Sequence, residues 1–243
     1  MRSVILLVTG TGTGVGKTVV TAAVAALARD RGASVAVVKP AQTGLEEGEY
    51  GDLHDVHRLS GADDLHEWAR YPDPLAPATA ARRVGIEPLR ADDVAHRVRE
   101  LDDRDLVLVE GAGGLLVRYD EQGSTIADVA RLLDAAVLVV TRPGLGTLSD
   151  TALTLEAMAH RGLRLGGLVI GNWPTEPDLA MRCNVSDLET VAGQPLAGVL
   201  PSGAGVLDPE TFLAVARSSL GPALGGRFDA AGFRHHWSME VHG

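Results

Sequence analysis

The residues best suited to chemistry lie in one glycine-rich segment, residues 10–18, which reads Gly-Thr-Gly-Thr-Gly-Val-Gly-Lys-Thr. A buried-strand pattern precedes it and a helical pattern follows it, which is the context that a phosphate-binding loop requires. Glycines let backbone N–H groups approach phosphate oxygens, and the helix that follows adds the positive end of its dipole. Lys17 can reach the β- and γ-phosphates, and the Thr18 hydroxyl can bind Mg²⁺. The segment therefore predicts binding of a nucleoside triphosphate with Mg²⁺.

The spacing of this loop is unusual, because five residues separate Gly10 from Gly16 where four are the rule. The alternative interpretation is a glycine-rich turn that binds nothing. That alternative does not explain why Gly-Lys-Thr stands at the start of a helix, directly after a buried strand. We interpret the segment as a phosphate loop that is longer by one residue.

A second cation follows the next predicted strand. Lys39 stands at the carboxyl end of residues 34–38, and Thr43 adds a hydroxyl on the same loop. In doubly wound sheets, ligands bind beyond the carboxyl ends of the strands. Lys39 would therefore supply local positive charge to an anionic ligand, and a solvated surface lysine is the alternative.

Two carboxylates could complete a metal site near these loops. Glu110 ends the predicted strand at residues 105–109 and precedes Gly-Ala-Gly-Gly, which suggests close approach of a ligand. Asp52 opens a predicted helix. Carboxylate oxygens beside a phosphate loop suit Mg²⁺. The alternatives are a solvated acid for Glu110 and an ordinary N-cap for Asp52.

The later loops offer weaker candidates. Gly144 and Gly146 permit close backbone contact before a long helix, and Ser149 or Asp150 lies near the start of that helix. Asn172 follows another strand and could read a base through its amide. Ordinary cap and turn chemistry is the alternative at each of these positions.

Other conspicuous residues are interpreted as structural. The single cysteine, Cys183, cannot form an internal disulfide and is interpreted as a spare thiol. Trp68 and Trp237 are expected to pack in the interior. His235 and His236 are adjacent, so they would point apart on a regular element, and we expect them in a solvated tail.

Alternating strands and helices must hold these positions. Strands are predicted at residues 3–9, 34–38, 105–109, 135–141, 165–170 and 196–200. Helices are predicted at residues 18–31, 52–60, 88–103, 125–133, 146–161, 178–192 and 208–219. The alternation predicts an α/β fold, a doubly wound and mostly parallel sheet with helices on both faces, of the P-loop NTPase type. We expect one catalytic domain over residues 1–243, with a weakly patterned tail at 221–243.

Composition limits the class of protein. Apolar residues make up 45% of the 243 residues and aromatic residues only 4%, which predicts the aliphatic core that a parallel sheet needs. A net charge of −10 disfavours binding to nucleic acid or to anionic membranes. The N-terminal apolar run is too short to span a membrane and leads straight into the phosphate loop, so we expect a cytoplasmic protein.

Taken together, these loops resemble those of the dethiobiotin synthetase family. The matching pieces are the phosphate loop, Lys39-Pro-x-x-Thr-Gly, Asp52, Glu110-Gly-Ala-Gly-Gly, Leu145-Gly146 and Pro201. The resemblance extends from about Val4 to Pro201. The combination is specific to the family, although no single piece is.

The resemblance implies an ATP-dependent cyclo-ligase of biotin biosynthesis. In that reaction 7,8-diaminononanoate takes up CO₂ as a carbamate, which attacks the γ-phosphate of ATP and forms a carbamic–phosphoric anhydride. The second amine closes the ureido ring and expels phosphate, and the products are dethiobiotin, ADP and phosphate. The resemblance also implies ATP as co-substrate, Mg²⁺ as cofactor, and a homodimer with substrate at the subunit interface.

Individual roles follow from the same resemblance. Lys17 and Lys39 are implied as catalytic residues, and Thr18, Asp52 and Glu110 as metal ligands. The implied nucleotide-binding residues are Thr13, Gly14, Val15, Gly16, Lys17, Thr18, Asp52, Glu110, Gly111, Ala112, Gly113, Gly171, Asn172, Trp173, Pro174, Pro201, Ser202 and Gly203. The implied substrate-binding residues are Lys39, Thr43, Gly113, Gly114, Leu145 and Gly146, of which the last four match partner-side segments of the family.

The chain departs from the family pattern at one point. Ser149-Asp150 stands where an Asn-His pair often follows Leu-Gly-x-x. This chain therefore has no asparagine at this position to make the hydrogen bond expected with the tail of the substrate. No second change in the sequence clearly compensates for it.

Other nucleotide-binding proteins remain as alternatives. A dimerising ATPase switch of the partitioning type resembles this pattern, but its loop usually carries an extra lysine where this chain has Gly12 and Thr13. A related amide-forming ligase usually has an additional glutamine-handling domain, for which the chain is too short. A small-molecule kinase usually keeps the strict loop spacing and an arginine-bearing lid.

Overall fold

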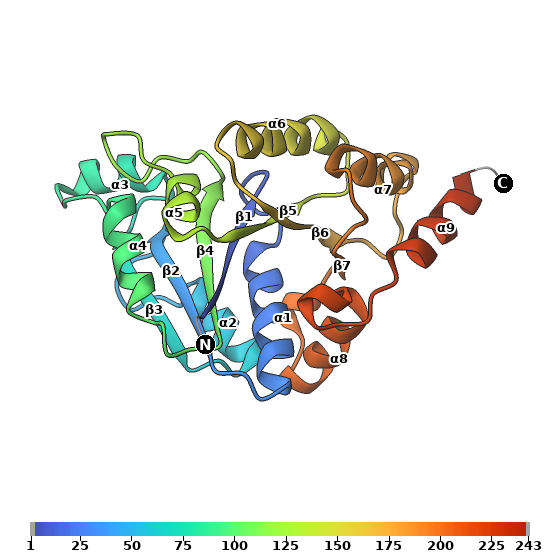
Figure 1. Cartoon of the computed structure of the whole chain (residues 1–243), viewed down its shortest axis with the longest axis horizontal. Coiled ribbons are helices and arrows are strands. Elements are labelled where there is room, and N and C mark those ends of the chain that lie inside the picture. Colours follow the sequence, from blue (N-terminus) through green and yellow to red (C-terminus); the bar gives the residue numbers. More distant parts are fainter. Residues whose placement is uncertain (1–2, 242–243) are drawn as a thin grey trace.

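The structure is a computed structural model that describes the backbone of residues 3–241 and the side chains of residues 3–237. Within these residues, seven parallel strands form one sheet in the order β3-β2-β4-β1-β5-β6-β7 (Figure 1). The strands are β1 (Val4–Gly10), β2 (Val35–Thr43), β3 (Asp64–Tyr71), β4 (Leu106–Gly114), β5 (Ala136–Thr141), β6 (Leu165–Trp173) and β7 (Gly198–Pro201). Because β2 to β4 lie on one side of β1 and β5 to β7 on the other, the carboxyl end of β1 is a switch point, where such sheets bind ligands.

Helices cover both faces of the sheet (Figure 1). One face carries α1 (Lys17–Asp30), α2 (Asp52–Ser60) and α8 (Pro209–Ser219). The other face carries α3 (Pro77–Val84), α4 (Ala91–Arg99), α5 (Ile126–Leu133), α6 (Thr147–His160) and α7 (Leu179–Ala192). The last helix, α9 (Ala230–Val241), lies beside α7, and two short 3-10 segments, η1 (Ala204–Val206) and η2 (Pro222–Leu224), flank α8. None of the helices within residues 3–241 is long and apolar enough to cross a membrane.

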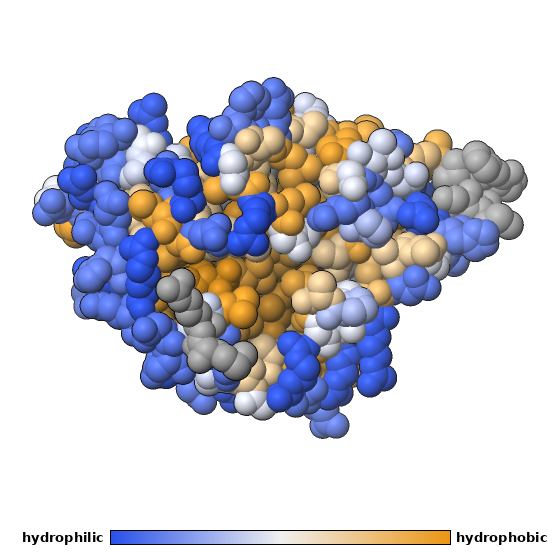
Figure 2. All heavy atoms as spheres, in the orientation of Figure 1, coloured by the Kyte–Doolittle hydropathy of each residue, from blue (hydrophilic) through white to orange (hydrophobic). Residues whose placement is uncertain are grey.

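Two cores, one on each face, follow from the continuous aliphatic strands. Leu7 and Val8 are neighbours on β1, and both are 0% exposed although their side chains enter different cores. A strand of this kind needs helices on both sides, because successive side chains point to opposite faces. Figure 2 shows apolar residues over the middle of the sheet and hydrophilic residues over the outer surfaces of α4 and α8, as expected of amphipathic helices.

The predicted fold class is confirmed, but three strands run further than the sequence indicated. β2 continues to Thr43, so Lys39 and Thr43 lie in a strand instead of a loop. β4 likewise includes Glu110 and the glycines up to Gly114, and β6 includes the segment up to Trp173. The extension of β2 has a clear cause, because β3 pairs with it from Ala36 to Thr43 and continues its hydrogen-bond ladder.

The edge strand β3 and the helix α9 in the C-terminal segment were not predicted. β3 reads Asp-Leu-His-Glu-Trp-Ala-Arg-Tyr and is mostly half-buried, so it lacks the apolar run of a central strand. The helix expected at residues 88–103 is shorter, as α4 (Ala91–Arg99), and α3 begins at Pro77, a residue suited to a first helical position. The tail contains α9, although its sequence showed no clear pattern.

Candidate active site

The phosphate loop connects the central strand β1 to α1. Gly16 precedes α1 with a left-handed φ of 97°, and a Cβ at this position would lie 2.5 Å from the carbonyl oxygen of Gly171. Only glycine fits such a place without strain. The Lys17 ammonium donates a hydrogen bond to the carbonyl oxygen of Gly12 at 3.0 Å, so its side chain folds back over the loop. A cation and the unpaired backbone donors of a helix start therefore lie together, which suits a phosphate.

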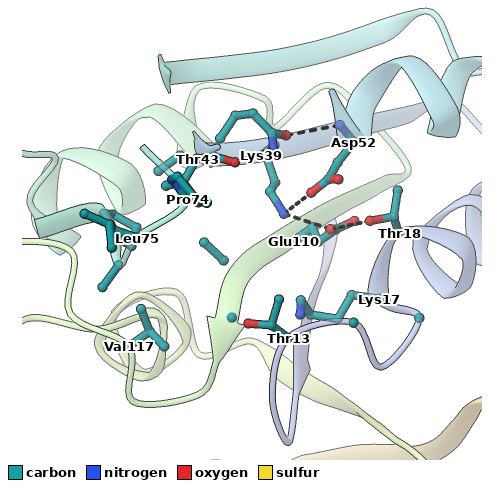
Figure 3. A pocket seen from close by; sticks show the side chains of 18 of the residues that line it. Thr13, Lys17, Thr18, Lys39, Thr43, Asp52, Pro74, Leu75, Glu110 and Val117 are labelled. Atoms are coloured by element: carbon teal, nitrogen blue, oxygen red, sulfur yellow. Dashed lines mark hydrogen bonds and ion pairs between the residues drawn. The ribbon is translucent and has the colours of Figure 1, made fainter. Parts of the chain in front are cut away.

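A cavity of about 730 Å³ opens beside this loop (Figure 3). Lys17 and Lys39 both line it, and Figure 3 shows their side chains entering it from α1 and from β2, on either side of Glu110. They are the only two lysines in the chain. Residues far apart in the sequence meet here because the carboxyl ends of β1, β2 and β4 are neighbours in the sheet. The arrangement can hold two anions next to each other.

Lys39 is held by two carboxylates. Its Nζ lies 2.5 Å from Oδ2 of Asp52 and 2.9 Å from Oε1 of Glu110, and it donates a further hydrogen bond to the carbonyl oxygen of Gly111 at 3.3 Å. Burial by itself would lower the pKa of Lys39, but the charges of Glu110 and then Asp52 outweigh it and raise the pKa above the ordinary value. Lys39 is therefore a buried ammonium that stays charged at neutral pH.

Asp52 stays ionised for the complementary reason. It is the first residue of α2, and its side chain is one-third exposed. Burial would raise its pKa, but the charge and hydrogen bond of Lys39 outweigh that effect, so the pKa of Asp52 lies below its ordinary value. The pair is thus an ion pair at the edge of the cavity.

Thr18, Asp52 and Glu110 form a set of oxygen atoms that fits Mg²⁺. The Thr18 hydroxyl donates to Oε1 of Glu110 at 3.0 Å, and Lys39 bridges this carboxylate to Asp52. Glu110 is 0% exposed, yet its second oxygen, Oε2, has no hydrogen-bond partner within the described residues. An unpaired buried carboxylate oxygen is costly, and a metal ion would satisfy it. Two carboxylates and a hydroxyl would supply only part of the coordination shell of Mg²⁺. Phosphate oxygens and water would supply the remaining ligands.

Lys17 is in a different electrostatic position from Lys39. Burial and the nearby charge of Lys39 lower its pKa below the ordinary value, and Glu110 and Asp52 offset this only in part. No carboxylate within the described residues forms a salt bridge with it. An anion bound in the cavity would therefore stabilise the charged form of Lys17.

Most residues expected around the phosphates and the metal lie in this one cavity. They are Thr13, Gly14, Gly16, Lys17, Thr18, Lys39, Thr43, Asp52, Glu110, Ala112 and Gly113. Val15 and Gly111 do not line it, because Val15 is packed in the core and Gly111 lies against Ile126. The side chain of Thr43 is half-buried at the end of β2.

The residues expected around the base and at a subunit interface lie elsewhere. Trp173, Pro174 and Pro201 border a second cavity at the ends of β6 and β7. Leu145 and Gly146 precede α6 and do not line either cavity, and the Leu145 side chain is 82% exposed. These positions are therefore separate from the site of the two lysines.

Sequence reasoning missed one wall of the main cavity. Pro74, Leu75, Ala76 and Pro77 lie between β3 and α3, and Figure 3 shows Pro74, Leu75 and Val117 at the end of the cavity away from Thr18. From the sequence, the prolines at 72, 74 and 77 indicate only an extended or turn-like segment. Since β3 was not predicted, nothing indicated that the loop after it reaches the ligand edge of the sheet. This wall is apolar and would contact carbon atoms.

Asp150 has a partner that the sequence did not reveal. Its Oδ2 accepts a hydrogen bond from Nη2 of Arg142 at 2.6 Å, which ties the end of β5 to the first turn of α6. Both side chains of the pair are partly exposed. Arg142 thus neutralises the carboxylate that stands at the departure from the family pattern.

The fold and the loop define the chain as a P-loop NTPase. A family model described as an AAA domain matches residues 5–210. Among solved structures, the MinD cell division ATPase of Pyrococcus furiosus is 22% identical with a TM-score of 0.52, and covers 100% of this chain and 99% of its own. A ParA family ATPase from Chlorobium tepidum is 18% identical with a TM-score of 0.55 and covers 98% of both chains. At these identities the likeness concerns the fold alone.

The sequence identity to several curated proteins is much higher than to these solved structures. The ATP-dependent dethiobiotin synthetase BioD of Frankia casuarinae is 68% identical over 230 residues, which is 94% of this chain and 97% of the relative. The proteins of that name from a Parafrankia species and from Streptomyces coelicolor are 64% and 57% identical, over 97% and 94% of this chain. The chain belongs to the dethiobiotin synthetase family of ATP-dependent ligases.

Proposed function

We propose that this protein makes dethiobiotin from 7,8-diaminononanoate, CO₂ and ATP, and that the cavity of Lys17 and Lys39 is where the bonds change. Membership in the family supports the overall reaction. One observation carries the proposed site. Two ammonium groups, two carboxylates and a hydroxyl from β2, β4, α1 and α2 converge where the phosphate loop ends and α1 begins.

The chemistry has an electrostatic difficulty that these residues address. One amine of the substrate attacks CO₂, loses a proton and becomes a carbamate, so that an anion must then approach the γ-phosphate of ATP. Lys17 would hold the phosphate side and Lys39 the carbamate side, which reduces the repulsion and keeps the attacking oxygen in line. The carbamate oxygen bonds to phosphorus as ADP leaves. The second amine then bonds to the carbamate carbon, loses its proton and expels phosphate.

Thr18, Asp52 and Glu110 are proposed to hold Mg²⁺. When bound, the metal supplies positive charge to the transferring phosphoryl group. The unpaired Oε2 of Glu110 supports this assignment. Once these carboxylates hold the metal, the Lys39 side chain would be free to leave them and bind the carbamate.

The remaining walls suit a diamine on a carbon chain. Thr43 is proposed to donate a hydrogen bond to the carbamate, and the backbone of Gly113 and Gly114 to contact the substrate. The apolar wall of residues 74–77 with Val117 would pack against methylene groups. The segments at 171–174 and 201–203 would flank the base, since they lie at the carboxyl ends of β6 and β7, on the edge of the sheet where the phosphate loop lies.

A homodimer is proposed, in which Leu145 and Gly146 of one copy approach the substrate of the other. Leu145 and Leu153 support it, because they are 82% and 63% exposed on or next to α6. Large exposed side chains that lie near one another favour a contact with another chain. We further propose that residues 1–243 act as one catalytic domain in the cytoplasm, with small-molecule substrates and neither nucleic acid nor membrane as partners.

The proposal is tested by incubating the protein with 7,8-diaminononanoate, bicarbonate, ATP and Mg²⁺. The expected result is one dethiobiotin, identified by mass, for each ADP and phosphate formed. Omitting the diamine should stop ADP formation. A partitioning-type ATPase would instead hydrolyse ATP slowly without the diamine and respond to DNA or lipid. That outcome would reject the proposed reaction.

A further inference from the structure

A buried tyrosine lies next to the glycine segment that follows Glu110. Tyr119 is 1% exposed, and its hydroxyl oxygen accepts a hydrogen bond from the backbone N–H of Ala112 at 2.9 Å. Burial raises the pKa of Tyr119 above its ordinary value. The hydroxyl is therefore a neutral acceptor for a backbone group of β4.

The Ala112 amide needs such an acceptor because β4 bulges at this point. The pairing of β1 with β4 shifts between Glu110 and Gly114, where β4 has two more residues than β1. A bulge takes backbone groups out of the regular hydrogen-bond ladder and changes their direction. A buried N–H without a partner is costly, so the Tyr119 hydroxyl serves where a neighbouring strand would otherwise accept.

The same peptide unit contacts Lys39 through its other end. Lys39 donates a hydrogen bond to the carbonyl oxygen of Gly111 at 3.3 Å, and this carbonyl shares its peptide bond with the Ala112 N–H. A trans peptide bond is planar, with its C=O and N–H pointing in opposite directions. The Tyr119 hydroxyl therefore fixes the direction in which the Gly111 carbonyl faces Lys39, and the two hydrogen bonds polarise each other.

Tyr119 is itself held on an ordered turn. Its N–H donates to the carbonyl oxygen of Ser124 at 2.8 Å, and the carboxylate of Asp120 accepts the Ser124 N–H at 2.9 Å. Directly after this turn, Thr125 and Asp128 form the capping box that begins α5. The ring is thus anchored to the start of a helix, as a residue that positions another group requires.

The Gly111 carbonyl differs from the other partners of Lys39 because it is neutral. Asp52 and Glu110 are the carboxylates proposed to bind Mg²⁺, and a bound metal would take them from Lys39. The Gly111 carbonyl is not in that set of ligands, so it remains available to the ammonium. Its direction would then determine where the ammonium lies when the carbamate forms.

We propose that Tyr119 is a positioning residue for Lys39, which acts through the Gly111–Ala112 peptide and sets where the ammonium meets the carbamate. This inference rests on the proposed function, because it assumes that Lys39 binds an anionic intermediate. Tyr119 does not line the main cavity, so it would touch neither the substrate nor the metal.

The hydrogen bond itself is tested by Tyr119→Phe, which removes the hydroxyl and keeps the ring. Tyr71→Phe is the matched control, since Tyr71 is also 1% exposed but its hydroxyl forms no hydrogen bond with another described residue. Nuclear magnetic resonance should show the Ala112 amide exchanging with solvent about tenfold faster in Tyr119→Phe and at the wild-type rate in Tyr71→Phe. Equal exchange of Ala112 in the two variants overturns the inference.

Turnover tests the effect on the reaction. Dethiobiotin formation is measured per ATP-binding site, so that unfolded protein does not lower the result. Lys39 meets the carbamate only after the diamine has bound, so kcat of Tyr119→Phe should fall about tenfold, while KM for the diamine and for ATP stays within about twofold of wild type. Tyr71→Phe should retain the wild-type kcat, and equal kcat in the two variants overturns the inference.

Amine labelling separates the positioning of Lys39 from a general loosening of the site. Without nucleotide, Lys39 should be labelled about threefold faster in Tyr119→Phe, because it loses an oriented carbonyl. The rate at Lys17 should not change, since its ammonium donates to the carbonyl oxygen of Gly12 instead. An equal rise at both lysines would show a merely structural role and overturn the inference.

These outcomes are distinct from failure of the proposed function. A wild type that forms no dethiobiotin rejects the proposed function and the carbamate with it. The exchange of Ala112 and the labelling of Lys39 then still decide whether Tyr119 orients Lys39. A wild type that forms dethiobiotin, with unchanged kinetics in Tyr119→Phe, rejects the role of Tyr119 alone.

Discussion

Lys39 lies between the two carboxylates that are proposed as metal ligands, 2.5 Å from Asp52 and 2.9 Å from Glu110. A divalent cation held by Asp52 and Glu110 would compete with the Lys39 ammonium for these carboxylates. Such competition would free Lys39 for an anionic substrate, and we call it the exchange. Lys39 therefore forms ion pairs with Asp52 and Glu110 when no ligand is bound, and it is proposed to hold the anionic substrate during catalysis.

This exchange predicts that removing Lys39 strengthens metal binding. Lys39→Met should bind Mn²⁺ at least about tenfold more tightly than the wild type when nucleotide is absent, because the competing charge is gone. Isothermal titration or the electron paramagnetic resonance of free Mn²⁺ measures it. Arg217→Met is a suitable control, since Arg217 pairs with Asp30 at the other end of α1 from Lys17. Unchanged or weaker Mn²⁺ binding in Lys39→Met would speak against the exchange.

The two lysines should differ in reactivity, and the chain offers a clean measurement because it has only two. Burial and Lys39 lower the pKa of Lys17, whereas the carboxylates raise the pKa of Lys39. As pH rises, Lys17 loses its proton first and becomes the nucleophile first. An amine-directed reagent at pH 8 to 9 should label Lys17 before Lys39, as peptide mass spectrometry would report. ATP should protect Lys17, and preferential labelling of Lys39 is the contrary result.

The contact between β6 and the phosphate loop predicts a sensitive glycine. A Cβ on Gly171 would meet the carbonyl oxygen of Val15 at 2.1 Å, so Gly171→Ala must push the loop away. We expect a loss of stability of about 1–3 kcal/mol in urea unfolding and weaker ATP binding. Gly144→Ala is the matched control, because its Cβ would find only Met181 at an ordinary 3.6 Å. Equal behaviour of the two variants would contradict the packing described for the loop.

The exposed side chains of Leu145 and Leu153 predict the oligomeric state. If α6 forms the proposed interface, Leu153→Glu should shift the protein from dimer to monomer in sedimentation velocity, since a buried unpaired charge at an interface is costly. Turnover should fall along with the dimer. Leu179→Glu serves as control, because Leu179 is similarly exposed at 58% but lies at the start of α7. A wild-type protein that sediments as a monomer would rule out the shared site.

Much of the fold could be predicted from the sequence, because its central strands are continuous aliphatic runs. The aliphatic runs of β1 and β4 can hardly be anything but buried strands. β3 was missed because Asp64, Glu67 and Arg70 interrupt its apolar residues, so this edge strand carries no such signal. The longer ends of β2, β4 and β6 also escaped, because whether a strand continues depends on a neighbouring strand that pairs with it.

The candidate site could be predicted where a recognisable motif stands at the carboxyl end of a strand that is evident in the sequence. Lys17, Thr18 and Glu110 follow strands that are evident in the sequence, and they meet as expected. The pairing of Lys39 with Asp52 and Glu110 was not expected, because the sequence gives no distance between side chains on different elements. The wall of residues 74–77, the Arg142–Asp150 pair and the second cavity at the ends of β6 and β7 depend on segments that lie close together only in three dimensions.

The role of Lys39 is tested most directly by Lys39→Gln, with ATP binding and dethiobiotin formation measured on the same sample. ATP should bind within about threefold of wild type, since Lys17 and the loop remain, while turnover should fall about a thousandfold or more. Lys39→Gln that forms dethiobiotin at the wild-type rate would contradict the central claim that two ammonium groups hold the reacting anions together.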